Sequence, residues 1–169
     1  MPKSEHAAAQ NVPVNISLHT ERTIRATPQA VYALSLDSAR FPALFSGFGP
    51  IPGLRRITPH GPPGVGATRD VEDLTGVVLK ERIDALEPDR RHAYTLSGLQ
   101  PPLAWLARAG HADWHFVTSS EGTRVVWTYD FELTSALAWP IAWPLLQGCM
   151  RVAMQRCLDA MAQELESRH

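Results

Sequence analysis

Two histidines and an aspartate alternate along the segment HADWH, at His111, Asp113 and His115. Imidazole and carboxylate side chains bind zinc and carry out acid–base catalysis. In an extended strand, however, the Cα atoms of His111 and His115 would lie about 13 Å apart, too far for both rings to bind one zinc ion comfortably. The spacing favours a structural role, in which Asp113 pairs with a neighbouring histidine or with a cation across the sheet, and we expect no metal site.

The next strand indicates which way these side chains point. In TRVVWTYDFEL, residues 123–133, Trp127, Tyr129 and Phe131 fall on one face, because alternate residues of a strand share a face. This aromatic face must turn toward the core. By the same parity, Trp114 and Phe116 of the preceding strand point inward, and the histidine–aspartate trio points outward to water.

Polar residues that share a face with apolar neighbours are better candidates for function. Glu81 alternates with Leu79 in VVLKERIDAL, and Arg69 shares a face with Val71 in TRDVED. A buried carboxylate is costly unless it is paired or protonated, so we expect Glu81 and Arg69 to satisfy one another. Alternatively, a register shift of one residue would turn both outward as surface charges. Tyr94 is a third candidate, either as a hydroxyl donor or as a core residue with a solvated tip.

An apolar cavity wall is predicted from the inward aromatic residues and from one stripe of the C-terminal helix. Its expected members are Trp114, Phe116, Trp127, Tyr129, Phe131, Met150 and Met154. The alternative is that these side chains only fill the core. The loop SGLQPPLAWLARAG, residues 97–110, is unusually apolar and is predicted to cover the cavity mouth, with Trp105 as a ligand contact; packing against Trp139 and Trp143 is its structural alternative.

The elements that must position these residues follow from periodicity. A strand over 14–26 is followed by a Thr-capped helix in TPQAVYALSLD and by a short helix in SARFPALF. Six further strands are separated by turn residues, and a long amphipathic helix covers 138–167. We therefore predict an α+β fold, in which a curved antiparallel sheet of six to seven strands wraps around the C-terminal helix.

Composition limits the classes of function. The chain of 169 residues suits one domain over 14–169 after a disordered tail at 1–13, and its net charge of -1 argues against nucleic-acid binding. The apolar run 136–150 is shorter than the roughly 20 residues that span a bilayer, although contact of its tryptophans with a membrane surface stays open. Cys149 and Cys157, about 12 Å apart on one helix, cannot form a disulfide with each other, and two free thiols favour the cytoplasm.

Several segments resemble the polyketide cyclase/dehydrase branch of the START-like (SRPBCC, helix-grip) superfamily. They are ATPQAVYALSLDSARFPALF, GVGATRDVE, LEPDRRHAYTLSG and EGTRVVWTYDFEL, and the resemblance covers residues 14–167. It implies a deep, mostly apolar cavity between sheet and helix. Members of the superfamily bind lipids, hormones or polyketides, and some catalyse cyclisation or dehydration. The resemblance supplies no shared catalytic motif and implies neither a metal nor an organic cofactor.

Three functions are compatible with this sequence. The first is binding of a small hydrophobic molecule of the lipid, isoprenoid or aromatic polyketide type, by a monomer or weak homodimer. The second is a cyclase or dehydratase in which Glu81 or Tyr94 moves a proton and Arg69 stabilises an enolate oxygen. The third is a protein-interaction module that uses the tryptophan-rich and proline-rich surface at 101–106 and 139–144. A filled core would favour the third.

Overall fold

A seven-stranded antiparallel sheet forms the body of the protein. The computed structural model describes residues 14–168, and the tail predicted at 1–13 lies outside the described residues. The strand order is β1-β9-β8-β7-β6-β5-β4, so the first strand pairs with the last. The strands are β1 Asn15–Ile24, β4 Leu54–Pro59, β5 Thr68–Asp73, β6 Val78–Glu87, β7 Arg91–Ser97, β8 Ala107–Ser119 and β9 Gly122–Leu133. The predicted number of strands is confirmed.

Two short helices and a small hairpin connect β1 to β4. Helix α1 spans Pro28–Leu36, and it begins where predicted because the Thr27 hydroxyl accepts a hydrogen bond of 3.2 Å from the Ala30 N–H. Helix α2 spans Phe41–Leu44, and the hairpin is formed by β2 at Gly47–Phe48 and β3 at Ile51–Pro52. The guanidinium of Arg156 lies 4.5 Å from the ring centre of Phe48 and holds this hairpin against the C-terminal helix.

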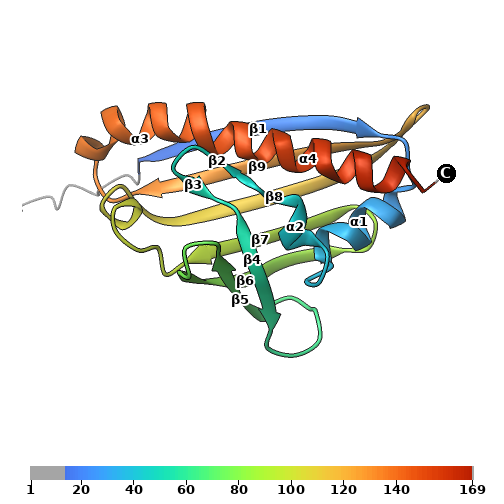
Figure 1. The fold of residues 1–169 in the computed structure, drawn as a ribbon, viewed down its shortest axis with the longest axis horizontal. Coiled ribbons are helices and arrows are strands. Elements are labelled where there is room, and N and C mark those ends of the chain that lie inside the picture. The colour runs from blue at the N-terminus through green and yellow to red at the C-terminus, as the bar shows by residue number, and fades with distance from the viewer. Residues whose placement is uncertain (1–13, 169) are drawn as a thin grey trace, which may run out of the picture.

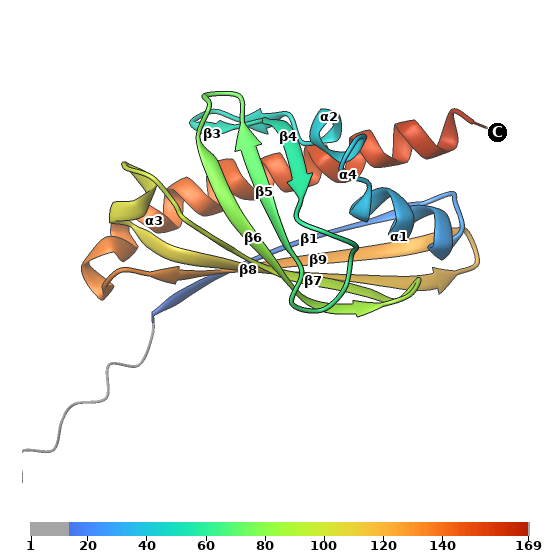
Figure 2. The same cartoon turned by 90° about the horizontal axis from the view of Figure 1, so that it is seen from below.

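The C-terminal helical segment crosses the concave side of the sheet, as Figures 1 and 2 show. Helix α3 spans Trp139–Leu145 and helix α4 spans Arg151–Glu166, joined by a wider π-helical turn at Leu146–Met150. The sequence predicts one regular helix here. The irregular turn begins two residues after Pro144, which lacks a backbone N–H and so removes one hydrogen bond of a regular helix. No helix within residues 14–168 is long and apolar enough to cross a membrane.

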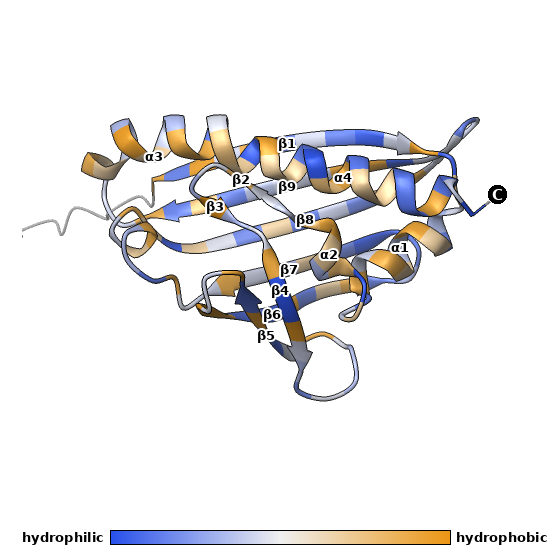
Figure 3. Ribbon diagram, in the orientation of Figure 1, coloured by the Kyte–Doolittle hydropathy of each residue, from blue (hydrophilic) through white to orange (hydrophobic). Residues whose placement is uncertain are grey.

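The core lies between the sheet and α4. Along the strands, apolar residues alternate with polar ones (Figure 3), and the inward set includes Trp114 and Trp127, which are directly opposite each other on β8 and β9 and stack with ring centres 4.0 Å apart. On the helix, Met154, Leu158 and Met161 are fully buried. The sheet and the helix therefore bury their apolar faces against each other, as the alternation predicts.

Strand β8 is longer than the sequence predicts. It begins at Ala107, where a loop was expected to continue to Gly110, and Ala107 and Gly110 pair with Leu133 and Phe131 of β9. The segment ARAG has low strand propensity, so its extended form depends on pairing with β9. The segment that connects β7 to β8 is accordingly shorter than the sequence predicts.

Candidate ligand-binding cavity

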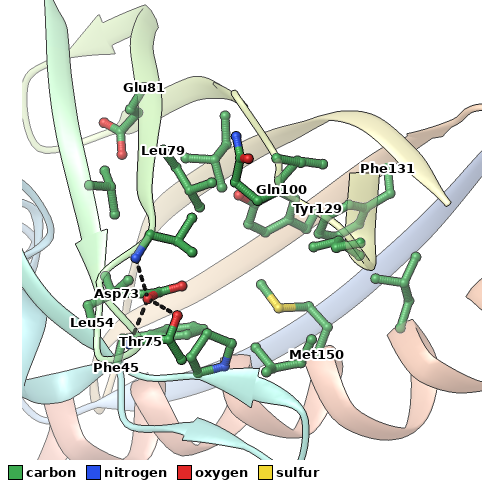
Figure 4. A pocket seen from close by; sticks show the side chains of 18 of the residues that line it. Phe45, Leu54, Asp73, Thr75, Leu79, Glu81, Gln100, Tyr129, Phe131 and Met150 are labelled. Carbon is green, nitrogen blue, oxygen red and sulfur yellow. Dashed lines mark hydrogen bonds between the residues drawn. The ribbon is translucent and has the colours of Figure 1, made fainter. Parts of the chain in front are cut away.

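A cavity of about 340 Å³ lies between the concave face of the sheet and the helical segment (Figure 4). Its walls come from β4 to β9, from the β2–β3 hairpin, from the segment 99–106 and from the π-helical turn. This volume lies in the range of about 300–1,000 Å³ that is typical of small-molecule sites. The core is therefore not filled.

Most of the apolar side chains predicted for the wall do line the cavity. They are Trp114, Trp127, Tyr129, Phe131 and Met150. Tyr129 and Phe131 stack with ring centres 4.6 Å apart, continuing the aromatic surface that begins at the Trp114–Trp127 pair. One side of the cavity is thus a rigid aromatic surface.

Three residues predicted to contact the ligand do not line the cavity. Phe116 lies beyond its end, where Tyr32 of α1 packs edge-on at 5.7 Å between ring centres. Met154, one helical turn after Met150, is fully buried in the packed core. Trp105 is 70% exposed to solvent, because its 3₁₀ turn directs the side chain away from the cavity. The sequence patterns indicated which side chains point inward, but they did not indicate where the cavity ends.

Arg69 and Glu81 face each other across β5 and β6 and line the cavity. The Arg69 Nε and Nη2 atoms both donate to Glu81 Oε1, with 2.7 Å for the Nε contact. The pair is inward-facing because β5 and β6 stay in register between positions 68 and 72; the irregularity of β6 occurs later, between Ile83 and Ala85 on its β7 side. Burial raises the pKa of the Glu81 carboxyl, and the nearby Arg69 charge opposes this rise.

Tyr94 and Tyr129 stand next to this ion pair. Their rings meet edge-on with centres 6.1 Å apart, and both line the cavity. Burial, followed by the neighbouring Tyr129 and the Glu81 charge, raises the pKa of Tyr94 well above its usual value. Burial likewise raises the pKa of Tyr129. Both side chains are therefore neutral hydroxyls that donate and accept hydrogen bonds.

His92 lies behind this wall, on the same strand as Tyr94. Its Nδ1 atom is 3.4 Å from the Ser35 hydroxyl, and its Nε2 atom is buried without a hydrogen-bond partner among the described residues. Burial, with a smaller contribution from the Arg69 charge, lowers the pKa of His92 to about 3. His92 is thus a neutral, structural histidine at the back of the site.

Asp73 is a lining residue that was not predicted from the sequence. It is 6% exposed and is the last residue of β5. Arg69, Val71 and Asp73 occupy alternate positions, so the parity that turned Arg69 inward also applied to Asp73. This alternation includes Asp73, but position 73 lies at the end of the strand, two residues before the turn residues Thr75 and Gly76. Ser35 and Gln100 also line the cavity without having been predicted.

The segment 99–106, which belongs to the loop 97–110 predicted to cover the cavity mouth, forms part of the cavity wall. Gln100, Leu103 and Leu106 are part of the wall, and the Thr134 hydroxyl anchors the segment by donating to the Trp105 carbonyl at 2.7 Å. Trp139 and Trp143 stack on each other at 5.9 Å and stay half-exposed.

The HADWH segment presents its polar residues on the outer face of β8. Arg91 donates two hydrogen bonds to the Asp113 carboxylate, of 3.0 and 2.8 Å, and the His115 Nε2 atom lies 3.2 Å from Asp113. His111 instead lies 2.9 Å from the Thr95 hydroxyl. Within residues 14–168, no group of three or more histidine, cysteine or acidic side chains is arranged to hold a metal ion. Cys149 and Cys157 are both free thiols.

A curved sheet around a long C-terminal helix, with a cavity between them, defines the helix-grip class of proteins. The chain belongs to the family described as polyketide cyclase / dehydrase and lipid transport, which it matches over residues 15–166. The resemblance to the START-like superfamily is thereby confirmed. No functionally curated protein matches the sequence.

Solved structures share the fold at low sequence identity. Truncated norcoclaurine synthase from Thalictrum flavum is 15% identical, with a TM-score of 0.70 over 93% of this chain and 97% of that one. The protein TTHA0849 from Thermus thermophilus is 18% identical, with a TM-score of 0.67 over 90% of this chain and 99% of that one. The di-domain ARO/CYC StfQ of the steffimycin biosynthetic pathway is 14% identical, with a TM-score of 0.71 over 91% of this chain and 52% of that one. At these identities the likeness concerns the fold.

Proposed function

We propose that the protein binds a small hydrophobic molecule, of the lipid, isoprenoid or aromatic polyketide type, in the cavity between sheet and helix. The observation that carries this proposal is an unfilled cavity of about 340 Å³ with an aromatic wall and few polar groups. Apolar surface at such a site favours transfer of an apolar ligand from water, at roughly 25 cal/mol per Å². A cytoplasmic location and a monomer or weak dimer remain predictions.

Mass spectrometry of the native protein purified from its own host tests this function most directly. A co-purifying small molecule would identify the ligand class. In parallel, an apolar naphthalene fluorophore can be titrated while the total tryptophan fluorescence is followed, since two of the five indoles, those of Trp114 and Trp127, line the cavity. Saturable quenching with one site per chain is expected.

Two methionines on the helical segment provide a matched pair of variants. Met150→Trp inserts a larger side chain into the cavity, whereas Met154→Leu changes a buried side chain outside it. We expect Met150→Trp to weaken fluorophore binding at least about tenfold and Met154→Leu to leave it almost unchanged. Equal binding by both variants, with no ligand in the native protein, would refute the proposal.

A second candidate function is proton transfer on a bound carbonyl compound. It is favoured by one observation, the convergence of Arg69, Glu81 and Tyr94 on the same cavity. Both Arg69 hydrogen bonds go to Glu81 Oε1, so Oε2 would have to accept the proton, and pairing with the guanidinium makes the carboxylate a weaker base. Proton NMR of naphthylacetone in D₂O would detect catalysed exchange of the α protons. Exchange that is accelerated by the protein and lost in Glu81→Gln would favour the enzyme over the carrier.

A further inference from the structure

Asp73 uses only one of its two carboxylate oxygens within the protein. Oδ1 accepts hydrogen bonds from the Thr75 N–H at 2.8 Å, from the Thr75 hydroxyl at 2.6 Å and from the Val77 N–H at 3.1 Å. These three contacts organise the turn between β5 and β6. They explain why an acidic residue ends this strand, but they do not involve Oδ2.

The second oxygen has no partner in the described part of the chain. No donor in residues 14–168 forms a hydrogen bond to Oδ2, and Asp73 takes part in no ion pair there. The side chain is buried, and Figure 4 shows its carboxylate at the edge of the cavity with the bonded oxygen toward Thr75 and the other toward the interior. A carboxylate oxygen that faces a mostly apolar cavity and has no donor from the protein favours a ligand that supplies one.

The charges on the wall identify the kind of donor. Among the described lining residues, the charged side chains are Arg69, Glu81 and Asp73. Arg69 and Glu81 neutralise each other by direct hydrogen bonds, which leaves the Asp73 carboxylate without a counter-charge. A cation is the electrostatic complement of this site.

We infer that the ligand carries a protonated amine, which binds Asp73 Oδ2 while its apolar body fills the cavity. This inference rests on the proposed ligand-binding function and narrows its substrate class. The orientation follows from the strand: Arg69 and Asp73 point to the same side of β5 with about 13 Å between their Cα atoms. The paired Arg69 and Glu81 offer an amine no net counter-charge, whereas Asp73 does, so the amine lies at the Asp73 end and the opposite end of the ligand lies near Arg69, Tyr94 and Tyr129.

An isosteric series of probes tests this assignment at pH 7. Naphthylethylamine, naphthylethanol and naphthylacetate have the same ring and differ in charge and donor capacity at one end. We expect the wild-type protein to bind the amine at least about tenfold more tightly than the alcohol, as a charge-assisted hydrogen bond requires, and the carboxylate most weakly. Isothermal titration calorimetry gives the three affinities.

Two variants distinguish the proposed contact of Asp73 with the ligand from its hydrogen bonds within the turn. Asp73→Asn keeps an oxygen for the turn and can place an NH₂ group toward the cavity, and it should abolish the preference for the amine. Thr75→Val removes the hydroxyl that donates to Oδ1 but leaves Oδ2 in place, and it should keep the preference. Melting curves show whether each variant is folded.

The outcomes distinguish this inference from the proposed function. Loss of the amine preference in Asp73→Asn and its retention in Thr75→Val would support the assignment. Binding of all three probes with equal affinity, or of the alcohol as tightly as the amine, would overturn the amine assignment and leave the binding function intact. Failure of every probe to bind the folded wild-type protein would overturn both.

Discussion

Arg69 and Glu81 form an ion pair across β5 and β6 that is almost completely removed from solvent, with side-chain exposures of 7% and 5%. On the opposite face of the same two strands, the neighbouring positions Asp70 and Lys80 form a second ion pair, at 2.6 Å, that is open to water. The two pairs lie on the same two strands and differ in how far they are buried. Comparing them shows how burial changes the contribution of an ion pair to stability.

Removing one partner of the buried pair should be strongly destabilising. Arg69→Met leaves the Glu81 carboxylate buried and unpaired, and Glu81→Leu does the same to the guanidinium, so each should lower the free energy of unfolding by about 3–5 kcal/mol. The double variant Arg69→Met/Glu81→Leu should regain most of this loss, because it removes both charges. Urea unfolding of the four proteins measures these changes.

The exposed pair provides the control. Asp70→Asn breaks the contact with Lys80, and we expect a far smaller change, since solvent screens both charges. If single substitutions in the buried pair were as mild as Asp70→Asn, the pair would not be desolvated in solution. The cavity wall would then differ from the one described.

Alternation predicted the inward position of Arg69 and Glu81 for strands without a register shift, whereas it did not predict the boundary of the cavity. Alternation depends on local strand geometry, which sequence encodes directly. Which inward residues contact empty space depends on the path of the helix and on the connecting segments. Met150 lines the cavity and Met154 does not, although both belong to the same apolar stripe.

The start of β8 and the role of Asp73 were missed for related reasons. The residues Ala107 to Gly110 adopt a strand because β9 pairs with them, which is a tertiary effect that overrides weak propensity. Asp73 had the correct parity, but its function depends on the turn that occupies one oxygen and leaves the other toward the cavity. Local sequence patterns predict which face of a strand a residue lies on, whereas long-range packing determines what that residue contacts.

His92 should make the protein sensitive to mild acid. Its pKa is lowered from 6.5 to about 3 in the folded state, so the folded protein binds this proton less readily than the unfolded chain does. The stability that depends on neutral His92 is therefore fully present above pH 6.5 and is lost as the pH falls toward 3. By linkage, His92 should account for about 2 kcal/mol of lost stability between pH 7 and pH 5.

The measurement compares the wild type with His92→Gln, which cannot titrate in this range. Urea unfolding at several pH values should give a steeper loss of stability for the wild type than for the variant below pH 6.5. If the free energy of unfolding of the two proteins fell equally with pH, His92 would be exposed to solvent in the folded protein, which would contradict its burial.

The outer face of β8 should not bind zinc tightly. Arg91 occupies both carboxylate oxygens of Asp113, and this contact raises the pKa of the Arg91 guanidinium. His111 contacts Thr95 of β7 instead, and it lies two residues before Asp113 on β8. A zinc titration should show no stoichiometric site in the wild type or in His115→Ala. Tight binding that is lost in His115→Ala would contradict this assignment.

Gly110 should be required for the shape of the cavity wall. A Cβ atom at this position would lie 2.5 Å from Cε1 of Tyr129 and 3.1 Å from Cε1 of Phe131, so Gly110→Ala must move at least one ring. Because overpacking a core typically costs about 1–3 kcal/mol, we expect a loss of that size in urea unfolding. The displaced ring should also enter the cavity and weaken binding of the naphthalene fluorophore.

Two further variants decide whether this effect is steric. Gly148→Ala, in the π-helical turn, adds a Cβ that would contact nothing within 4 Å and should leave stability and binding nearly unchanged. Adding Tyr129→Leu to Gly110→Ala removes the clashing ring atom, so the double variant should be more stable than the sum of the two single losses predicts. If the losses are additive, the ring and the added methyl group do not meet. Gly110 would then matter through its backbone and not through the space that it leaves for Tyr129.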